Sequence, residues 1–105
     1  MTDQHDLVDR VRAALREHEP REVRMMGGIS FMVDEQMLVA ARSGGDLLVR
    51  IDPVRAAELL ARPGVRPAVM GAARRPMGEG WISVDASALQ NDGLSFWLAV
   101  ALSRP

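Results

Sequence analysis

The sequence predicts an α+β fold: a five-stranded antiparallel sheet with helices packed on it, in the order α-β-β-β-α-β-β-α. Short apolar runs follow one another with turn residues between them, which favours antiparallel pairing of neighbouring strands. Three other segments carry an apolar stripe at helical spacing, and such helices must bury that stripe against one side of a sheet. The 105 residues are 48% hydrophobic and 26% charged, which is typical of one globular domain spanning 1–105.

The first predicted element is a helix over residues 4–18. Its apolar positions recur at helical spacing, and acidic residues precede basic ones along the segment, as the helix dipole favours. Pro20 lacks an amide hydrogen and clashes with the preceding turn, so the helix should end near His18 or Glu19. The apolar stripe consists of Leu7, Val8, Val11, Ala14 and Leu15.

A meander of three strands is predicted next. The first strand covers 23–33 and contains Gly27-Gly28, where glycine permits a bend, a bulge or the close approach of another backbone. Turn residues flank the other two strands, and the glycines of the second turn supply the positive φ angles of a hairpin. These strands are 37–41 and 47–51, with Asp34-Glu35 before the first and Ser43-Gly44-Gly45-Asp46 between them.

The second half of the chain is predicted to add a helix, two strands and a last helix. Asp52-Pro53 begins the helix over 53–62, because aspartate accepts hydrogen bonds from free amides at the N-cap and proline is tolerated at the first helical position. Pro63-Gly64 ends it. The later elements are strands at 66–70 and 81–84 and a helix within 89–102, capped by Asn91 or Asp92, with Leu94, Trp97, Leu98, Ala101 and Leu102 on one face.

Five strings, at 24–31, 36–39, 47–52, 80–84 and 94–98, follow one another in an order and spacing that resembles the TfoX N-terminal domain family. The string 24–31 is similar to the Met-Phe-Gly-Gly signature that opens this family, with Met26 in place of the phenylalanine. Further similar strings are 36–39, 47–52, 80–84 and 94–98, so the resemblance covers about 22–102. The motif residues that we expect to maintain the fold are Met25, Met26, Gly27, Gly28, Trp81 and Trp97.

This resemblance implies both a fold and a role. The family has the α-β(3)-α-β(2)-α arrangement of the secretion-chaperone-like fold, which agrees with the element order derived above. It is named after a regulator of natural competence that works with the cyclic-AMP receptor protein and carries a second, C-terminal helical domain. Because this chain ends at Pro105, we expect a freestanding N-terminal domain that acts as a non-enzymatic protein-interaction module in transcriptional regulation. The resemblance implies no catalytic residues.

The composition excludes several chemistries and predicts no cofactor. There is no cysteine for thiol catalysis or thiolate metal sites, and all thirteen basic residues are arginine, which excludes lysine Schiff-base and P-loop chemistry. The two histidines, His5 and His18, form neither a metal-ligand nor a catalytic-triad pattern. The acidic beginning and the lack of an apolar run of about 18 residues predict a cytoplasmic protein without membrane contact.

One local basic patch is the candidate binding site. The stretch 59–78 contains no acidic residue, although the whole chain has a net charge of −1 and a pI near 6.1. Attraction of phosphates to this patch would make the chain a direct nucleic-acid binder, but only Trp81 lies nearby as a stacking group. A solvated loop is the alternative interpretation. The patch consists of Arg62, Arg66, Arg74 and Arg75.

The strands 37–41 and 47–51 are apolar on both faces, whereas a sheet covered on one side should alternate polar and apolar residues. This pattern predicts a cover on the second face, either a homodimer or partner protein, or loops of the chain itself. Methionines at 25, 26, 32 and 37 fit a partner-binding face and a core equally well. A small-molecule-binding domain, with a pocket that the sequence does not reveal, is the remaining alternative.

Overall fold

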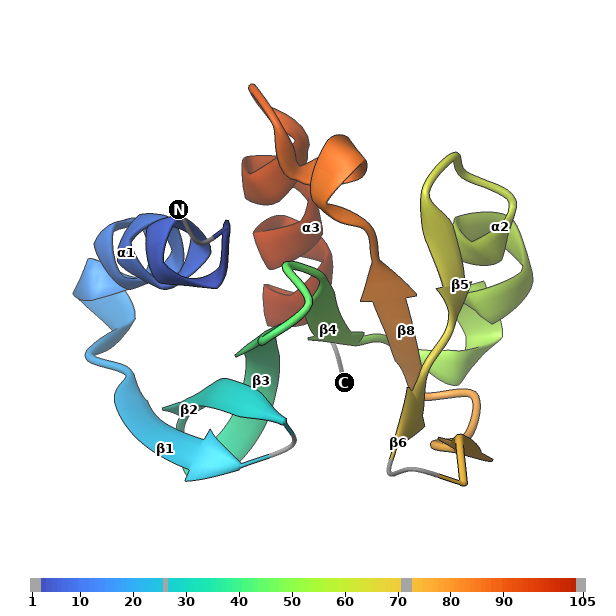
Figure 1. Ribbon diagram of the computed structural model, residues 1–105, viewed down its shortest axis with the longest axis horizontal. Helices are drawn as coiled ribbons and strands as arrows, with labels where there is room; N and C mark the ends of the chain where they lie inside the picture. Colours follow the sequence, from blue (N-terminus) through green and yellow to red (C-terminus); the bar gives the residue numbers. More distant parts are fainter. Residues whose placement is uncertain (1–2, 26, 71–72, 104–105) are drawn as a thin grey trace.

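Three helices pack on one face of a six-stranded antiparallel sheet, and a small two-stranded hairpin lies on its other side (Figure 1). This computed structural model describes residues 3–25, 27–70 and 73–103. The helices are α1 (Asp3–Ala14), α2 (Ala56–Leu60) and α3 (Gly93–Leu102). The strands of the large sheet are β1 (Arg21–Met25), β2 (Gly28–Val33), β3 (Gln36–Arg42), β4 (Leu47–Arg50), β5 (Val65–Pro67) and β8 (Trp81–Val84), and the hairpin consists of β6 (Val69–Met70) and β7 (Arg75–Pro76).

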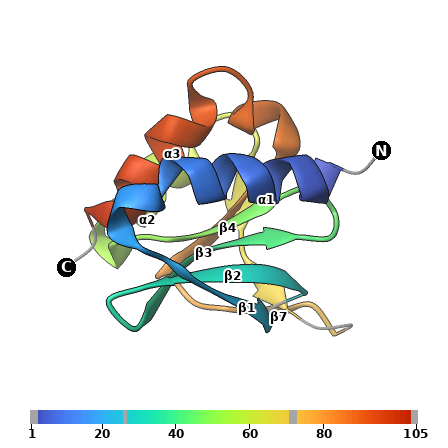
Figure 2. The ribbon, with the colours of Figure 1, turned by 90° about the vertical axis from the view of Figure 1, so that its left-hand side faces the viewer.

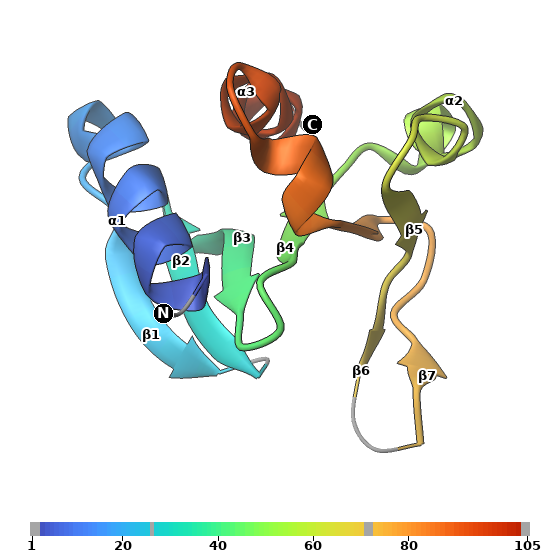
Figure 3. The same cartoon turned by 45° about the horizontal axis from the view of Figure 1, so that its top comes forward.

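The sheet is built in the order β1-β2-β3-β4-β8-β5, and every neighbouring pair is antiparallel. Figures 2 and 3 show α1 and α3 on the same side of these strands. The three-stranded meander predicted from the turns is therefore extended at both edges. None of the helices in the described part of the chain is long and apolar enough to cross a membrane.

The α+β class and the antiparallel sheet confirm the prediction, but the large sheet has six strands rather than five. The expected single strand 23–33 is two strands, because the chain reverses and Met25 becomes the register partner of Gly28. Gly27 has a φ of 75° at this reversal, a conformation that glycine adopts without a steric penalty. The glycine pair is predicted to permit a bend, a bulge or close backbone approach, and at Gly27 the chain makes a complete hairpin.

The predicted strand 66–70 is also divided. Its first part belongs to β5 and pairs with β8, whereas β6 leaves the sheet and pairs with β7. The Ala68 carbonyl lies at this division and accepts a hydrogen bond from the Met77 amide at 2.9 Å. The connection between the two predicted strands is therefore partly ordered as a hairpin.

The local signals at the helix ends act largely as predicted. Glu19 takes a left-handed conformation, with φ of 51°, and ends the first helical segment, whose last turn is the 3-10 helix η1 (Arg16–His18). The Asp52 side chain accepts a hydrogen bond from the Val54 amide at 3.1 Å, so the predicted N-cap is present. The helix that follows is shorter than the predicted 53–62, because η2 (Pro53–Arg55) forms a 3-10 turn before α2 begins.

The last helix is preceded by a 3-10 turn, η3 (Ala86–Leu89), that lies inside the segment predicted as helical. Asp92 occupies the position before α3, as predicted, but its carboxylate makes no capping hydrogen bond. Its backbone carbonyl instead accepts a hydrogen bond from the Phe96 amide at 3.0 Å.

The larger hydrophobic core lies between the helices and the sheet. Cross-strand partners Val39, Val49 and Ile82 are buried on this face. Trp97 of α3 lies in the same core and is 2% exposed. Other fully buried members of this core are Val11, Leu15, Phe31, Leu38, Leu47, Leu59, Val84 and Leu89.

The β6–β7 hairpin extends from β5 away from the helices (Figure 3), and residues next to it cover part of the opposite face of the sheet. Ala40 and Leu48 are register partners on that face, and both are completely buried together with Ala68, which leads into the hairpin. Met77 and Trp81 pack against the same small cluster. The apolar character of β3 and β4 on both faces is thus explained by a segment of the chain itself, which was one of the two covers expected from the sequence.

Candidate functional site

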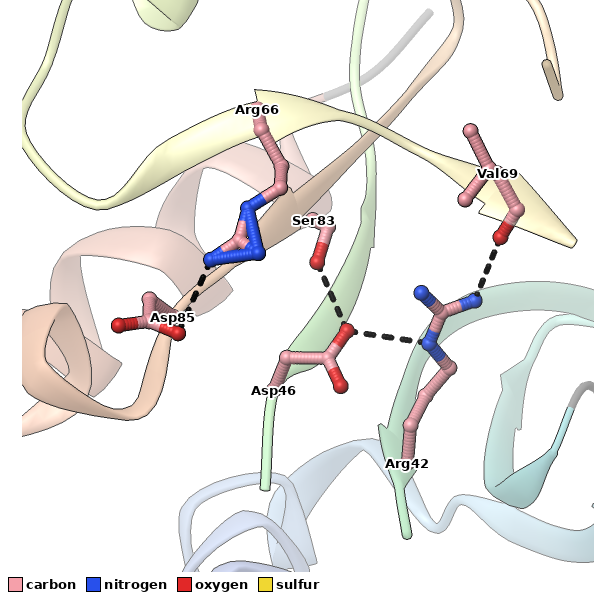
Figure 4. Close-up of polar contacts among 6 residues, drawn as sticks. All are labelled: Arg42, Asp46, Arg66, Val69, Ser83 and Asp85. Atoms are coloured by element: carbon pink, nitrogen blue, oxygen red, sulfur yellow. Dashed lines mark hydrogen bonds and ion pairs between the residues drawn. The ribbon is translucent and has the colours of Figure 1, made fainter. Parts of the chain in front are cut away.

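The most developed polar arrangement centres on Asp46, in the turn that leads into β4 (Figure 4). Its Oδ2 accepts a hydrogen bond from Ser83 Oγ at 2.7 Å and another from Arg42 Nε at 3.0 Å. Ser83 lies in β8 and is only 3% exposed. We name these three residues the Asp46 cluster. Its side chains link β3, the turn before β4, and β8.

The same arginine ties the hairpin to the sheet. Arg42 Nη1 donates a hydrogen bond to the Val69 carbonyl at 2.9 Å, and Val69 is the first residue of β6. The Arg42 and Asp46 side chains are 18% and 19% exposed, so this ion pair is partly shielded from water. A charge-assisted hydrogen bond in such surroundings is stronger than a neutral one. The Asp46 cluster therefore fixes the hairpin against the sheet.

A polar hollow of about 240 Å³ opens beside the Asp46 cluster. Arg66 and Asp85 form an ion pair at its side, with Nη2 and Oδ1 3.0 Å apart. Arg74, from the described end of the hairpin loop, also lines the hollow. Three arginines and two aspartates therefore surround it, which leaves one excess positive charge.

The polar hollow is lined by guanidinium groups and by carboxylates that are already paired with them. The Ser83 hydroxyl donates a hydrogen bond to the Asp46 carboxylate, which also pairs with Arg42, and none of the described residues that line the hollow is a histidine. Among the described residues there is no group of three His, Asp or Glu side chains that could hold a metal ion. The groups in this site that can bind a ligand are the arginine guanidinium groups, which bind carboxylates and phosphates.

The structure separates the four arginines of the predicted basic patch. Arg66 and Arg74 line the polar hollow, and Arg75 is exposed on β7 of the same hairpin. Arg62 does not line it: its guanidinium carbon lies 4.1 Å from the ring centroid of Phe96. Arg62 thus stacks on the helix side of the molecule, and the patch that the sequence predicted is reduced to three residues around the hairpin.

Sequence reasoning missed the Asp46 cluster. Asp46 was interpreted as a turn residue and Ser83 as part of a strand, and both interpretations are correct locally. Ser83 and Asp46 are 37 positions apart, and Arg42 reaches Val69 across 27 positions. The only signal in the sequence was Asp46 itself, a charged residue directly before an apolar strand. Its partners follow from the pairing of β4 with β8.

The motif residues take several different positions. Met25, at the end of β1, is 38% exposed, and Met26 lies outside the described residues. Gly28 lies so close to β3 that a Cβ there would overlap the Ala41 carbonyl oxygen and approach the Arg42 Cα to 2.6 Å. Close backbone approach is thus the role of Gly28, whereas Gly27 supplies the positive φ.

A second depression, the apolar pocket, lies between α2, the sheet and the β6–β7 hairpin. Its volume is about 280 Å³, and its walls include Ala56, Leu60, Ala68 and Trp81. Trp81 is half-buried, and the Arg50 guanidinium carbon lies 5.4 Å from its ring centroid. Trp81 therefore borders a pocket, unlike Trp97, which is enclosed by the core.

Comparisons with known proteins agree with this architecture. A crystal structure of a protein from Pseudomonas syringae superposes with a TM-score of 0.63 at 13% sequence identity, covering 92% of this chain and 97% of that one, which shows a shared fold. No curated protein matches the sequence. The sequence model of the TfoX N-terminal domain matches residues 13–104, nearly the whole chain, and confirms the resemblance found in the motifs. The chain belongs to the TfoX N-terminal domain family.

Proposed function

We propose that this chain is a non-enzymatic protein-interaction module with a regulatory role, and that it binds an acidic surface of a partner protein. The observation that carries the proposal is a group of arginines without carboxylate partners on the hairpin side of the sheet. Within the described part of the chain, no carboxylate pairs with Arg50, Arg74 or Arg75. Unpaired guanidinium groups are free to bind carboxylates of another protein.

Although the net charge of the chain is small, its charged side chains are distributed unevenly between the two sides of the sheet. Exposed carboxylates lie on the helix side, among them Asp6 and Asp9 of α1 and Glu58 of α2. On the hairpin side, Asp46 and Asp85 are paired with Arg42 and Arg66, and the exposed Glu79 offsets only one of the arginines that have no carboxylate partner. A surface with excess positive charge steers acidic partners toward itself and rejects basic ones. This supports a specific face for the contact.

The same surface is poorly suited to nucleic acid. Proteins that bind single strands combine cationic grooves with exposed aromatic rings on which bases stack. Phe31 and Trp97 are buried, Phe96 lies in α3 on the helix side, and Arg50 lies over the Trp81 ring. Among its described residues, the hairpin side therefore offers several arginines and one aromatic ring, Trp81, which is half-buried with Arg50 over it, and this favours a protein partner.

The regulatory part of the proposal comes from family membership. The family is named after a competence regulator, so a partner in transcription is the first class to test. A second copy of this chain is another candidate partner. The hairpin already covers Ala40 and Leu48, so the apolar strands by themselves require no dimer.

Affinity purification from the native cells, with nuclease treatment and mass spectrometry, tests the proposal. The wild-type protein is compared with the double variant Arg74→Glu and Arg75→Glu. The matched control is Arg16→Glu with Arg55→Glu, which changes the net charge equally but on the helix side. We expect one acidic partner to be captured by the wild type and the control and to be lost from the hairpin variant, because reversed charges repel it.

Other outcomes decide between the alternatives. Loss of the captured material on nuclease treatment, together with a steep decrease of affinity with salt, would establish nucleic-acid binding instead. Recovery of this chain alone, with a dimer mass in light scattering, would identify self-association. Equal loss in both charge variants would show that the contact does not use the hairpin side.

A further inference from the structure

We infer that the apolar pocket beside α2 is a binding site for a small apolar molecule of about one ring that carries a cationic group. This site shares the hairpin side with the proposed protein contact, and of the arginines of that contact Arg50 lies over the Trp81 ring that forms one wall. Three elements form its walls: α2 contributes Ala56 and Leu60, β8 contributes Trp81, and the hairpin region contributes Ala68 and Pro76. Pockets for small molecules are concave and mostly apolar, with a few polar groups that set orientation.

The size of the apolar pocket sets the size of the ligand. Its volume is about 280 Å³. A dry apolar cavity of about 150 Å³ is large enough to bind benzene. The apolar pocket therefore has room for one aromatic ring with a short side chain, while a steroid or a fatty acyl chain would exceed it. Trp81 supplies an aromatic wall, which favours a ring in offset or edge contact.

The charge at the rim of the apolar pocket determines which charge the ligand should carry. Glu79 is the only ionisable residue that lines the apolar pocket, it is exposed, and no cation pairs with it in the described part of the chain. Arg50 lies over the Trp81 ring but does not line the pocket. A free carboxylate at the mouth of an apolar pocket attracts an ammonium group and repels an anion. An aryl-alkyl amine has both features.

Three probes of one size and different charge test this site: 2-phenylethylamine, 2-phenylethanol and phenylacetate. Binding is measured from the NMR shifts of the Trp81 indole and the Ala56 and Ala68 methyl groups. We expect the amine to bind about threefold more tightly than the alcohol, as an exposed ion pair contributes little, and phenylacetate to bind most weakly. In Glu79→Gln, the amine and the alcohol should bind equally.

The second part of the test fills the apolar pocket with a larger side chain. Ala56→Phe should weaken binding of the amine and the alcohol at least tenfold, because the new ring occupies the space. Ala57→Phe is the matched control, since Ala57 is the exposed neighbour on the same helix and does not line the pocket. If Ala56→Phe does not fold, Ala56→Leu introduces a smaller side chain at the same place.

Two results would overturn the binding site, and a third would overturn its preference for a cationic group. One is the absence of shifts at Trp81 and the alanine methyl groups with all three probes at millimolar concentration. The other is equal loss of binding in the Ala56 and Ala57 variants, which would place the probes elsewhere. An unchanged order of affinities in Glu79→Gln would refute the cationic specificity. None of these results depends on the partner-capture experiment, because that experiment reports on Arg74 and Arg75.

Discussion

The two faces of the sheet are built in different ways. The helix side buries a large continuous core, in which Phe31, Leu38 and Trp97 are almost completely shielded from water. The hairpin side buries a much smaller cluster around Leu48 and secures its cover with polar contacts from Arg42. Both the polar hollow and the apolar pocket border the hairpin.

This difference separates stability from binding. A large apolar area removed from water supplies most of the folding free energy. A thin cover fixed by a few hydrogen bonds leaves depressions beside it and can open at low energetic cost. We therefore expect substitutions on the helix side to affect folding, and substitutions on the hairpin side to affect local opening and binding.

The largest effect is expected from Trp97→Ala. Removing a fully buried indole should lower the free energy of unfolding by about 3–5 kcal/mol, because it leaves a cavity in the core. Trp81→Ala on the hairpin side is the matched comparison and should cost at most about 2 kcal/mol, since its ring is only half-buried. Urea unfolding followed by circular dichroism measures both. Equal costs for the two tryptophans would break the proposed difference between the faces.

Gly28→Ala tests the sheet that the two faces share. The added methyl group would meet the Ala41 carbonyl, a backbone atom that cannot move aside, so we expect a loss of about 3 kcal/mol. Gly27→Ala should cost only about 1 kcal/mol, because that position needs a positive φ but is open. Thermal unfolding of both variants shows which of them loses more stability. A larger loss of stability in Gly27→Ala would contradict the close approach of Gly28 to β3.

Arg42→Ala tests the attachment of the hairpin. Losing its hydrogen bonds to Asp46 and to the Val69 carbonyl should cost about 1–2 kcal/mol and should act locally. Amide exchange of Met77, which is bonded to Ala68, should accelerate, while amides of the helix-side core keep their protection. Arg55→Ala, which removes a more exposed ion pair with Glu58, is the control. Uniform acceleration across the molecule would mean that the two faces unfold as one unit.

The smallest effect concerns the ion pair between α1 and β1. Hydrogen bonds from Arg12 hold the pKa of Glu22 below its ordinary value of 4.5, although partial burial opposes this. A lowered pKa means that the pair stabilises the fold above pH 4.5, and that this contribution is lost as the pH falls through the folded pKa. Glu22→Gln should therefore flatten the decrease of stability between pH 6 and 3. Unchanged pH dependence in the variant would show that the pair does not contribute.

The sequence by itself determined the types of most elements, because the signals for them are local. Pro20 ends a helical segment whatever surrounds it, and Asp52 caps the next one through its own neighbours. The alternation and turn residues of the meander likewise act over a few positions. The family followed from short strings in a fixed order, which the match over residues 13–104 confirms.

Only the tertiary structure decided which residues meet. Gly27 permits a bend or a reversal equally well, and pairing of β1 with β2 selects the reversal. Arg62 and Arg66 are near in sequence, yet one stacks on Phe96 and the other pairs with Asp85, because α3 and β8 bring different partners to them. The cover of Leu48 and the Asp46 cluster depend on contacts across tens of residues, and local patterns carry no information about such contacts.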